Sequence, residues 1–355
     1  MSPWATGLLG EVINGYRICR YLGGGGFGLV FEATNISTGS SFALKVLEPS
    51  SDAQAAAEFD SEGVLLKKLL NRSGVINWIE SSTAMLPVSL PSGAAAHLPV
   101  KYHVMALASG ALDEVLDDPA RRAAIPWEER ISHWRGAVLG VHQMHLSKVA
   151  HRDLKSGNCL LMVNKGNTEL RLTDLGRAKD FSLPPTLSAD VYASGRGDVR
   201  FAPPEYLWLQ GGLAETDFRM ADLYGLGSLL VELATGQPMT GLAIGSWGDI
   251  QKMRMQGVQD RQKGVKRDIA TLRPKFYRAI EHVAVEFPPA IRDEGVRLLR
   301  QLCDPEPSRR TYKSMGRIPK DPDAGCLWLL DRADIMLKRL KLENKGSRST
   351  RRSAS

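Results

Sequence analysis

Apolar residues recur along the chain with two different spacings. Residues 29–33 alternate between apolar and polar side chains, as a half-buried β-strand does. Residues 53–70 and 127–147 instead place apolar side chains three and four positions apart, which predicts two amphipathic helices. Residues 226–233 carry leucines at 226, 229, 230 and 233, the spacing of a strongly apolar helix, so we expect a buried helix there. Between these elements lie shorter polar segments, which carry the candidate chemistry.

A candidate reaction site lies around a predicted β-hairpin. Residues 159–163 and 170–173 read as two short strands on either side of a turn. Asn158 and Asp174 are nearly equidistant from that turn, so an antiparallel hairpin should bring them side by side. Hard oxygen donors in such a pair suit Mg²⁺, which takes one or two protein ligands plus substrate phosphates. Asp153 lies five residues before Asn158 and is placed to accept a proton, so we expect a phosphoryl-transfer site.

The motifs in this region resemble those of the eukaryotic-type (Hanks-type) protein kinase family, serine/threonine branch. Residues 151–158, HRDLKSGN, match the H-R-D-L-x-x-x-N catalytic loop, and residues 174–176, DLG, match D-F-G with Leu in place of Phe. The resemblance implies an α+β, bilobal protein-kinase-like fold, with a small β-rich N-lobe and a larger helical C-lobe. The implied organisation is an N-terminal extension (1–15), a kinase domain (16–315, N-lobe to about 105 and C-lobe from about 109), a C-terminal extension with an amphipathic helix (316–345) and a disordered basic tail (346–355).

A glycine-rich segment upstream resembles the G-x-G-x-x-G-x-V loop of the same family. Gly23, Gly25, Gly28 and Val30 occupy its fixed positions. Such a pattern alone is weak, because dinucleotide-binding proteins share it. Here a β-rich stretch follows the glycines rather than a helix, which favours a strand–loop–strand that covers phosphates through its backbone N–H groups.

The next strand ends in FALK, which resembles V-A-I-K and makes Lys45 the residue for the α- and β-phosphates. Its acidic partner should come from the helix at residues 53–70, where Glu58 and Glu62 are both candidates. We prefer Glu62, because it leads directly into an apolar helical run, and we expect Glu58 on the solvated face.

Residues 102–108 read as a buried strand that runs into the linker between the lobes. Met105 is expected behind the adenine, with backbone hydrogen bonds from residues 106–108. Residues 86–99, rich in Pro, Gly and Ala, are expected to form an inserted surface loop. The full set of expected ATP-binding residues is Leu22, Gly23, Gly24, Gly25, Gly26, Phe27, Gly28, Val30, Ala43, Lys45, Met105, Ala106, Leu107, Ala108 and Leu160.

The resemblance continues towards the C-terminus. Residues 200–205, RFAPPE, resemble the segment that ends in A-P-E, and residues 222–227 resemble D-x-x-S-x-G with Gly225 for Ser. Arg310 is expected to pair with Glu205 as a buried latch. Glu205, Asp222 and Arg310 are therefore expected to be structural, and His142 and His145 to be hydrogen-bonded structural histidines rather than metal ligands.

The implied reaction transfers the γ-phosphate of ATP to a protein hydroxyl. Asp153 would accept the hydroxyl proton and Lys155 would lie against the γ-phosphate; Lys155 also favours serine/threonine substrates. The expected catalytic residues are Asp153, Lys155, Lys45 and Glu62, the metal ligands are Asn158 and Asp174, and the cofactors are ATP and Mg²⁺. Two other readings stay open: a pseudokinase that serves as a nucleotide-binding scaffold, and a small-molecule kinase of similar fold.

One position departs from the family pattern. Gly197-Asp198 stands where serine/threonine kinases usually carry Gly-Thr. An ionised carboxylate only accepts hydrogen bonds, so Asp198 could pair with Lys155 but would repel Asp153. The residue specificity therefore stays open.

By resemblance to the family, Arg152 directly before Asp153 implies control by phosphorylation of the segment between Asp174 and Glu205. The candidate phosphosites there are Thr186, Ser188, Tyr192 and Ser194.

The formal net charge of +7 is concentrated at the C-terminus. Residues 338–355 contain seven basic residues and one acidic residue. We favour a solvated tail, with weak contact to nucleic acid or an anionic membrane as the alternative. No run of apolar residues is long enough for a transmembrane segment. The four cysteines are scattered along the chain, so we expect a reduced, cytoplasmic location. The resemblance implies protein substrates, and the oligomeric state is unknown.

Overall fold

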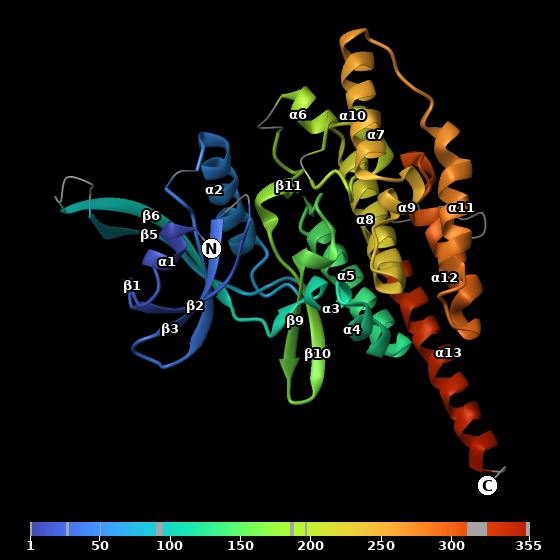
Figure 1. The fold of residues 1–355 in the computed structure, drawn as a ribbon, viewed down its shortest axis with the longest axis horizontal. Coiled ribbons are helices and arrows are strands. Elements are labelled where there is room, and N and C mark those ends of the chain that lie inside the picture. Colours follow the sequence, from blue (N-terminus) through green and yellow to red (C-terminus); the bar gives the residue numbers. More distant parts are fainter. Residues whose placement is uncertain are drawn as a thin grey trace.

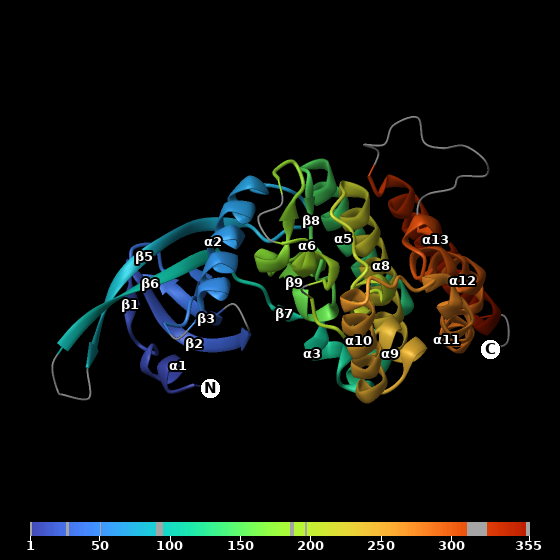
Figure 2. The same cartoon turned by 90° about the horizontal axis from the view of Figure 1, so that it is seen from above.

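The computed structural model describes residues 2–25, 28–49, 51–89, 95–184, 188–195, 197–310 and 325–352. Figure 1 shows two lobes, a β-rich N-terminal one and a larger helical one, and Figure 2 shows the same separation from above. The chain passes from the first lobe to the second directly after strand β6 (Ala95–Ala106). The expected α+β, bilobal architecture is confirmed.

The N-lobe is built on one antiparallel sheet. Its strand order, among the described residues, is β1-β2-β3-β4-β6-β5. Phe31, Leu44 and Val104 are fully buried against it, together with Ala5 of the short helix α1. Residues before 16 therefore belong to the packing of this lobe. The bounds are α1 (Pro3–Gly7), β1 (Val12–Ile13), β2 (Tyr16–Gly25), β3 (Gly28–Asn35), β4 (Ser41–Val46), β5 (Trp78–Ser89) and β6 (Ala95–Ala106).

The helix expected over residues 53–70 is α2 (Ala53–Lys68). It begins at Asp52, whose carboxylate accepts a hydrogen bond from the backbone N–H of Ala55 at 2.7 Å and so caps the first turn. In Figure 1 α2 lies on the side of the N-lobe that faces the C-lobe. This position lets its side chains reach the space between the lobes.

The surface loop expected over residues 86–99 is largely a β-hairpin. Strands β5 and β6 stay paired out to Ser89 and Ala95, and residues 90–94 lie outside the described part of the chain. The alternation of buried Ala84, exposed Met85 and buried Leu86 shows why the strand continues into the Pro- and Gly-rich stretch. Figure 2 shows this hairpin reaching away from the body of the protein.

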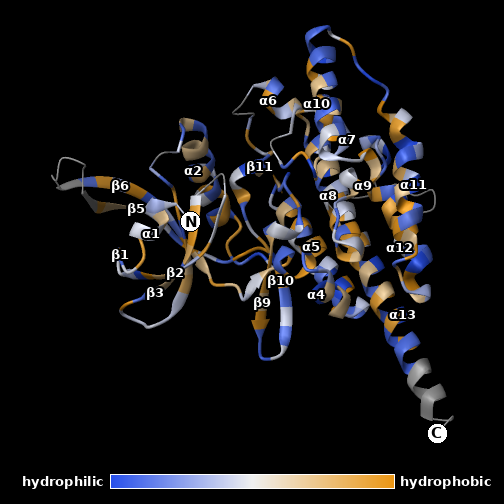
Figure 3. Cartoon of the chain, in the orientation of Figure 1, coloured by the Kyte–Doolittle hydropathy of each residue, from blue (hydrophilic) through white to orange (hydrophobic). Residues whose placement is uncertain are grey.

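The C-lobe is organised around α8 (Glu215–Thr235), which is buried along most of its length and ends at Gly236 with φ 76°. The helix expected over residues 127–147 is α5 (Trp127–Leu146), and its Trp134 donates to the Leu226 carbonyl of α8 at 2.8 Å. Figure 3 shows apolar positions gathered where these helices meet. The other helices are α3 (Asp113–Leu116), α4 (Pro119–Ala124), α6 (Ala189–Ala193), α7 (Pro204–Leu207), α9 (Met239–Ile244), α10 (Trp247–Gln262), α11 (Arg273–Ala284) and α12 (Pro289–Leu302).

Short strands lie where the C-lobe meets the N-lobe. The hairpin predicted from the sequence consists of β9 (Cys159–Asn164) and β10 (Asn167–Leu172), paired antiparallel with Cys159 opposite Leu172. Strand β7 (Gly110–Ala111) extends this hairpin, and β8 (Val149–Ala150) pairs with β11 (Lys179–Asp180). These pairings place the polar segments that follow β8 and β10 at the edge of the cleft.

The C-terminal helix α13 (Leu327–Arg352) is longer than expected. It packs on α5 and α12, and Asp334 accepts a hydrogen bond from Arg135 Nε of α5 at 2.7 Å. The disordered tail expected from residue 346 is wrong as far as Arg352, because the helix continues through this segment; residues 353–355 lie outside the described part. Of the helices that the structure describes, none combines the length and the apolar character needed to cross a membrane.

Candidate active site

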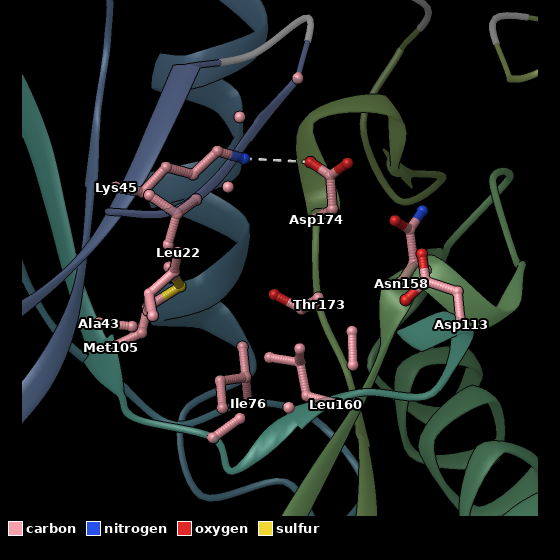
Figure 4. A pocket seen from close by; sticks show the side chains of 18 of the residues that line it. Leu22, Ala43, Lys45, Ile76, Met105, Asp113, Asn158, Leu160, Thr173 and Asp174 are labelled. Carbon is pink, nitrogen blue, oxygen red and sulfur yellow. Dashed lines mark hydrogen bonds and ion pairs between the residues drawn. The ribbon is translucent and has the colours of Figure 1, made fainter. Parts of the chain in front are cut away.

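The two lobes enclose a cavity of about 650 Å³. Figure 4 shows side chains entering it from both sides, with Lys45 from the N-lobe facing Asp174 from the C-lobe. Gly26 and Phe27 lie outside the described residues. The other expected ATP-binding residues all line the cavity: Leu22, Gly23, Gly24, Gly25, Gly28, Val30, Ala43, Lys45, Met105, Ala106, Leu107, Ala108 and Leu160.

Lys45 joins the two lobes through two carboxylates. Its Nζ lies 2.6 Å from Glu62 Oε2 of α2 and 3.0 Å from Asp174 Oδ1. Glu62 is therefore the acid that reaches Lys45, as the sequence suggested. Glu58 was wrongly expected on the solvated face: it is buried, and Gln54 donates to it at 2.9 Å. It lies four residues before Glu62, so it shares the same inward face of the helix.

The charges of this cluster are fixed by their mutual contacts. Burial acts to lower the pKa of Lys45, but the charges of Glu62 and Asp174 outweigh it, and the pKa lies above its ordinary value. Burial raises the pKa of Glu62, whereas Lys45 opposes that rise. Burial also acts on Asp174, but Lys45 holds the pKa of this carboxyl below its ordinary value. The short contacts favour an ammonium ion held between two carboxylates.

Helix α2 is held in place by a histidine of the sheet. His103 of β6 contacts the Phe59 carbonyl through Nε2 at 3.0 Å and Ser81 Oγ through Nδ1 at 2.7 Å. Burial lowers the pKa of His103 to about 4, so the ring is neutral at physiological pH. Gly63 lets the helix come this close, since a Cβ there would lie 2.7 Å from the His103 ring. The docking of α2 fixes where Glu62 points.

The catalytic loop is clamped by a buried aspartate of α8. Asp222 accepts hydrogen bonds from the backbone N–H groups of His151 at 2.9 Å and Arg152 at 2.7 Å, and it contacts His145 Nε2 at 2.8 Å. Arg152 has φ 66°, a left-handed conformation that is costly for a residue with a side chain. Burial acts to raise the pKa of Asp222, but His145 and the loop N–H groups keep it below its ordinary value. The structural role expected for Asp222, and for His145, fits these contacts.

Asp153, directly after this clamp, lines the cavity with both carboxylate oxygens engaged. Oδ1 accepts from the backbone N–H of Asp198 at 3.1 Å, and Oδ2 accepts from Arg177 Nη1 at 3.3 Å. Lys155 Nζ lies 3.7 Å from the same Oδ2. The arrangement holds a carboxylate beside two cations at the mouth of the cleft.

The carboxylate of Asp198 pairs with Arg200, with Nη2 and Oδ2 2.6 Å apart. The charge of Lys155, the partner expected from the sequence, also acts on this carboxylate. Burial acts to raise the pKa of Asp198, but the hydrogen bonds from Arg200 dominate and lower it. The backbone N–H of Asp198 donates to the Asp153 carboxylate and thereby supplies an attractive contact between the two residues.

Asn158 and Asp174 lie next to each other, as the hairpin predicted, and Figure 4 shows both facing the cavity. The amide Nδ2 of Asn158 donates to the Asp153 carbonyl at 2.7 Å, so its Oδ1 is left as the acceptor. Asp174 has φ 59°, a left-handed conformation of the kind that functional sites retain. An amide oxygen and a carboxylate form a donor set that fits Mg²⁺ with a phosphate ligand.

The candidate phosphosites between Asp174 and Glu205 differ in how exposed their side chains are. Thr186 lies outside the described residues, Ser188 is exposed, and Ser194 is half-buried and donates to the Val191 carbonyl. Tyr192 is 1% exposed, so its hydroxyl is not accessible in this conformation. Its ring lies over the Arg152 guanidinium, 5.0 Å from ring centroid to Cζ.

The latch expected between Glu205 and Arg310 is present. Arg310 Nη1 and Nη2 donate to the two carboxylate oxygens of Glu205 at 2.7 and 2.8 Å, and the side chain is fully buried. The same guanidinium also donates to the carbonyls of Asp304, Pro305 and Met220. It therefore ties the chain after α12 to α7 and α8.

Further residues that the sequence did not single out line the cavity, among them Ile76, Asp113, Thr173 and Arg177. Thr173 and Arg177 lie within three positions of Asp174, so their place next to the motif could have identified them. No sequence motif pointed to Ile76 or Asp113. Ile76 is brought in by its backbone bond to the Leu172 carbonyl, 96 residues along the chain, at 2.9 Å.

Comparison with known proteins agrees with this geometry. Residues 16–316 match the model of the protein kinase domain family. The chain is similar to the serine/threonine-protein kinase BRI1-like 2 of Arabidopsis thaliana, with 32% identity over 65% of this chain and 18% of that protein. It is also similar to a G-type lectin S-receptor-like serine/threonine-protein kinase of the same plant, with 30% identity over 65% of this chain and 26% of the relative.

A third relative is the brassinosteroid LRR receptor kinase BRI1 of Oryza sativa subsp. japonica, with 30% identity over 65% of this chain and 19% of that protein. The match thus spans roughly a fifth to a quarter of the length of these relatives. The family model, by contrast, covers the part of the chain that builds the sheet, the cleft, the catalytic loop and the Arg310 latch. The chain belongs to the protein kinase family.

Proposed function

We propose that this protein is a serine/threonine protein kinase that transfers the γ-phosphate of ATP to a hydroxyl group of a protein. The observation that carries the proposal is the bridge across the cleft. Lys45 is bound at once by Glu62 of α2 and by Asp174 of the other lobe. This bridge needs both lobes closed in register, which is the state that phosphoryl transfer requires.

ATP fits the cleft by size and by lining. A volume of about 650 Å³ lies within the range of small-molecule sites. Ala43 and Leu160 supply apolar surface on two sides for the adenine, with Met105 behind it. The backbone at residues 106–108 offers hydrogen-bonding groups to its edge. The phosphates would then extend beneath the strands on either side of the glycine loop, towards Lys45.

The transfer itself depends on charge and position. Asp153 accepts the proton of the substrate hydroxyl, and Arg177 and Lys155 orient its carboxylate. Lys155 also neutralises charge on the transferring phosphoryl group. Mg²⁺, held by Asn158 and Asp174 with the phosphates, would supply Lewis-acid neutralisation when bound. Lys155 beside Asp153 also supports a preference for serine and threonine over tyrosine.

Phosphorylation of the activation segment is the mode of regulation that we propose. Arg152 Nη1 bonds the Arg177 carbonyl at 3.3 Å, whereas Nε and Nη2 have no hydrogen-bond partner in the part of the chain that the structure describes. A phosphate on this segment would supply acceptors for them. Exposed Ser188 is the described candidate that a kinase can reach, and Thr186 remains a candidate from the sequence.

The decisive test compares the wild type with Asp153→Asn, using radiolabelled ATP and generic protein substrates. We expect at least about a 100-fold loss of label, because general-base catalysis contributes roughly 10² to 10⁴. Asp293→Asn, an exposed carboxylate of α12, is the matched control and should keep its activity. Equal label in wild type and Asp153→Asn would favour the scaffold, and label on free small molecules alone would favour a small-molecule kinase.

A further inference from the structure

A buried acid lies behind the catalytic loop and takes no part in the chemistry described so far. Glu232 of α8 is 3% exposed. Its Oε2 accepts two hydrogen bonds from one residue of the loop, from Ser156 Oγ at 2.6 Å and from the Ser156 backbone N–H at 3.2 Å. Its Oε1 has no hydrogen-bond partner among the described residues. A buried carboxylate with one free oxygen is costly, so its retention calls for a reason.

Ser156 lies between the proposed base and the proposed metal ligand. It opens the 3₁₀ turn Ser156–Asn158, and Asn158 closes the loop by donating to the Asp153 carbonyl at 2.7 Å. Asp222 clamps the loop on the other side, through the N–H groups of His151 and Arg152. The loop is thus held from α8 at two points, and Glu232 is the point next to Asn158.

We propose that Glu232 is a positioning residue for phosphoryl transfer: its ionised carboxylate holds the catalytic loop through Ser156, and protonation of this carboxylate loosens the hold and lowers turnover. The inference rests on the proposed function. Hydrogen bonds to an ionised acceptor are shorter and roughly twice as strong as neutral ones. The two bonds from Ser156 therefore weaken together when the carboxylate gains a proton.

The surroundings of Glu232 place its titration in the physiological range. Burial raises its pKa to about 7, the two bonds from Ser156 oppose that rise, the charge of Asp113 adds to it, and Lys155 acts against it. The thiol of Cys159 also faces this carboxylate, and burial raises its pKa well above the ordinary value, so it stays neutral. The Glu232 carboxyl therefore changes charge near neutral pH, whereas the neighbouring Cys159 thiol does not.

The test measures kcat and the KM for ATP from pH 5.5 to 8.5 in wild type, Glu232→Gln and Ser156→Ala. The wild type should lose kcat below a midpoint near pH 7. Glu232→Gln should lack this step and show about tenfold lower kcat at pH 8, the loss expected for weakened bonds to a charged group. The KM for ATP should stay within about twofold, because the adenine and Lys45 contacts lie elsewhere in the cleft.

Ser156→Ala gives an independent check on the direction. Removing the hydroxyl takes away the bond that lowers the pKa of Glu232, so the midpoint should move to higher pH. A wild-type pH step that persists in Glu232→Gln, or a midpoint in Ser156→Ala that is unchanged or lower, would overturn the inference while phosphoryl transfer stands. A wild type without transfer at any pH would instead overturn the proposed function, and the inference with it. Should Glu232→Gln fail to fold, the Ser156→Ala midpoint decides.

Discussion

Residue 198 contacts the proposed base, Asp153, through its backbone N–H. The Asp198 N–H donates to Asp153 Oδ1 at 3.1 Å, and the Asp198 carboxylate is engaged by Arg200. A threonine in this position would use its hydroxyl for such a contact. Here the arginine two residues later keeps the acidic side chain away from Asp153, so the departure from the family pattern is compatible with catalysis.

Gly197→Ala should therefore be more harmful than a change of the Asp198 side chain. A Cβ at residue 197 would lie 2.7 Å from Asp153 Oδ1 and 3.2 Å from the Arg152 carbonyl, which displaces the base. We expect kcat to fall by about tenfold or more, since a shift of about 1 Å in a reacting group costs up to 10². Asp198→Asn keeps the backbone N–H and should lose less. Steady-state kinetics of both variants measure the difference; a larger loss in Asp198→Asn would contradict this account.

At this scale the sequence predicted which side chains converge better than it predicted how they are oriented. Lys45, Glu62, Asp153, Asn158 and Asp174 could be named because motif spacing fixes which side chains converge. The orientation of the Asp198 side chain could not be predicted, because its rotamer decides which neighbouring cation the carboxylate contacts. The sequence suggested Lys155, whereas the structure shows an ion pair with Arg200. Burial of Tyr192 likewise depends on how its segment packs on α8.

Among the elements, Arg310 fastens the chain after α12 to α7 and α8. Arg310 makes a two-pronged ion pair with Glu205 of α7 and bonds three backbone carbonyls. Substituting one member of a buried pair leaves the other charge without compensation, which is the costly case.

Arg310→Met should lower the free energy of unfolding by about 3–5 kcal/mol. Arg309→Ala is the matched control, because the neighbouring arginine is exposed and pairs with Glu306 on the surface, where such pairs contribute about 0–1 kcal/mol. Chemical denaturation with a fluorescence readout measures both. Similar losses in the two variants would show that the latch does not stabilise the lobe.

Helices with a strong apolar periodicity were predicted correctly. A strand whose formation depends on pairing with a distant partner strand was missed. Helices α2 and α5 end within two residues of their expected bounds. The β5–β6 hairpin was read as a loop, since its Pro and Gly content outweighs a short alternation until the partner strand is known. The helical extension to Arg352 was missed because the polar, basic composition of residues 346–355 favoured a disordered tail.

Across the whole molecule, α13 connects the C-terminal region with the catalytic loop. The Cys326 N–H donates to His142 Nδ1 of α5 at 3.2 Å, and its thiol lies 3.9 Å from His145 Nδ1. His145 in turn contacts Asp222, the residue that clamps the loop. The amphipathic helix could be predicted from its leucines. Its docking surface could not, because the exposed face of α5 is defined only once α8 and β10 cover its other sides.

This connection makes α13 part of the C-lobe core, and two leucines of the same helix test it. Leu329 is fully buried, whereas Leu342 is 68% exposed. We expect Leu329→Ala to cost about 2–5 kcal/mol of unfolding free energy through lost burial and a residual cavity. Leu342→Ala should change it by no more than about 0.5 kcal/mol. Thermal unfolding followed by circular dichroism measures both, and a single cooperative transition shifted in Leu329→Ala is the expected result. An unshifted transition in that variant would contradict the packing of α13 in the C-lobe core.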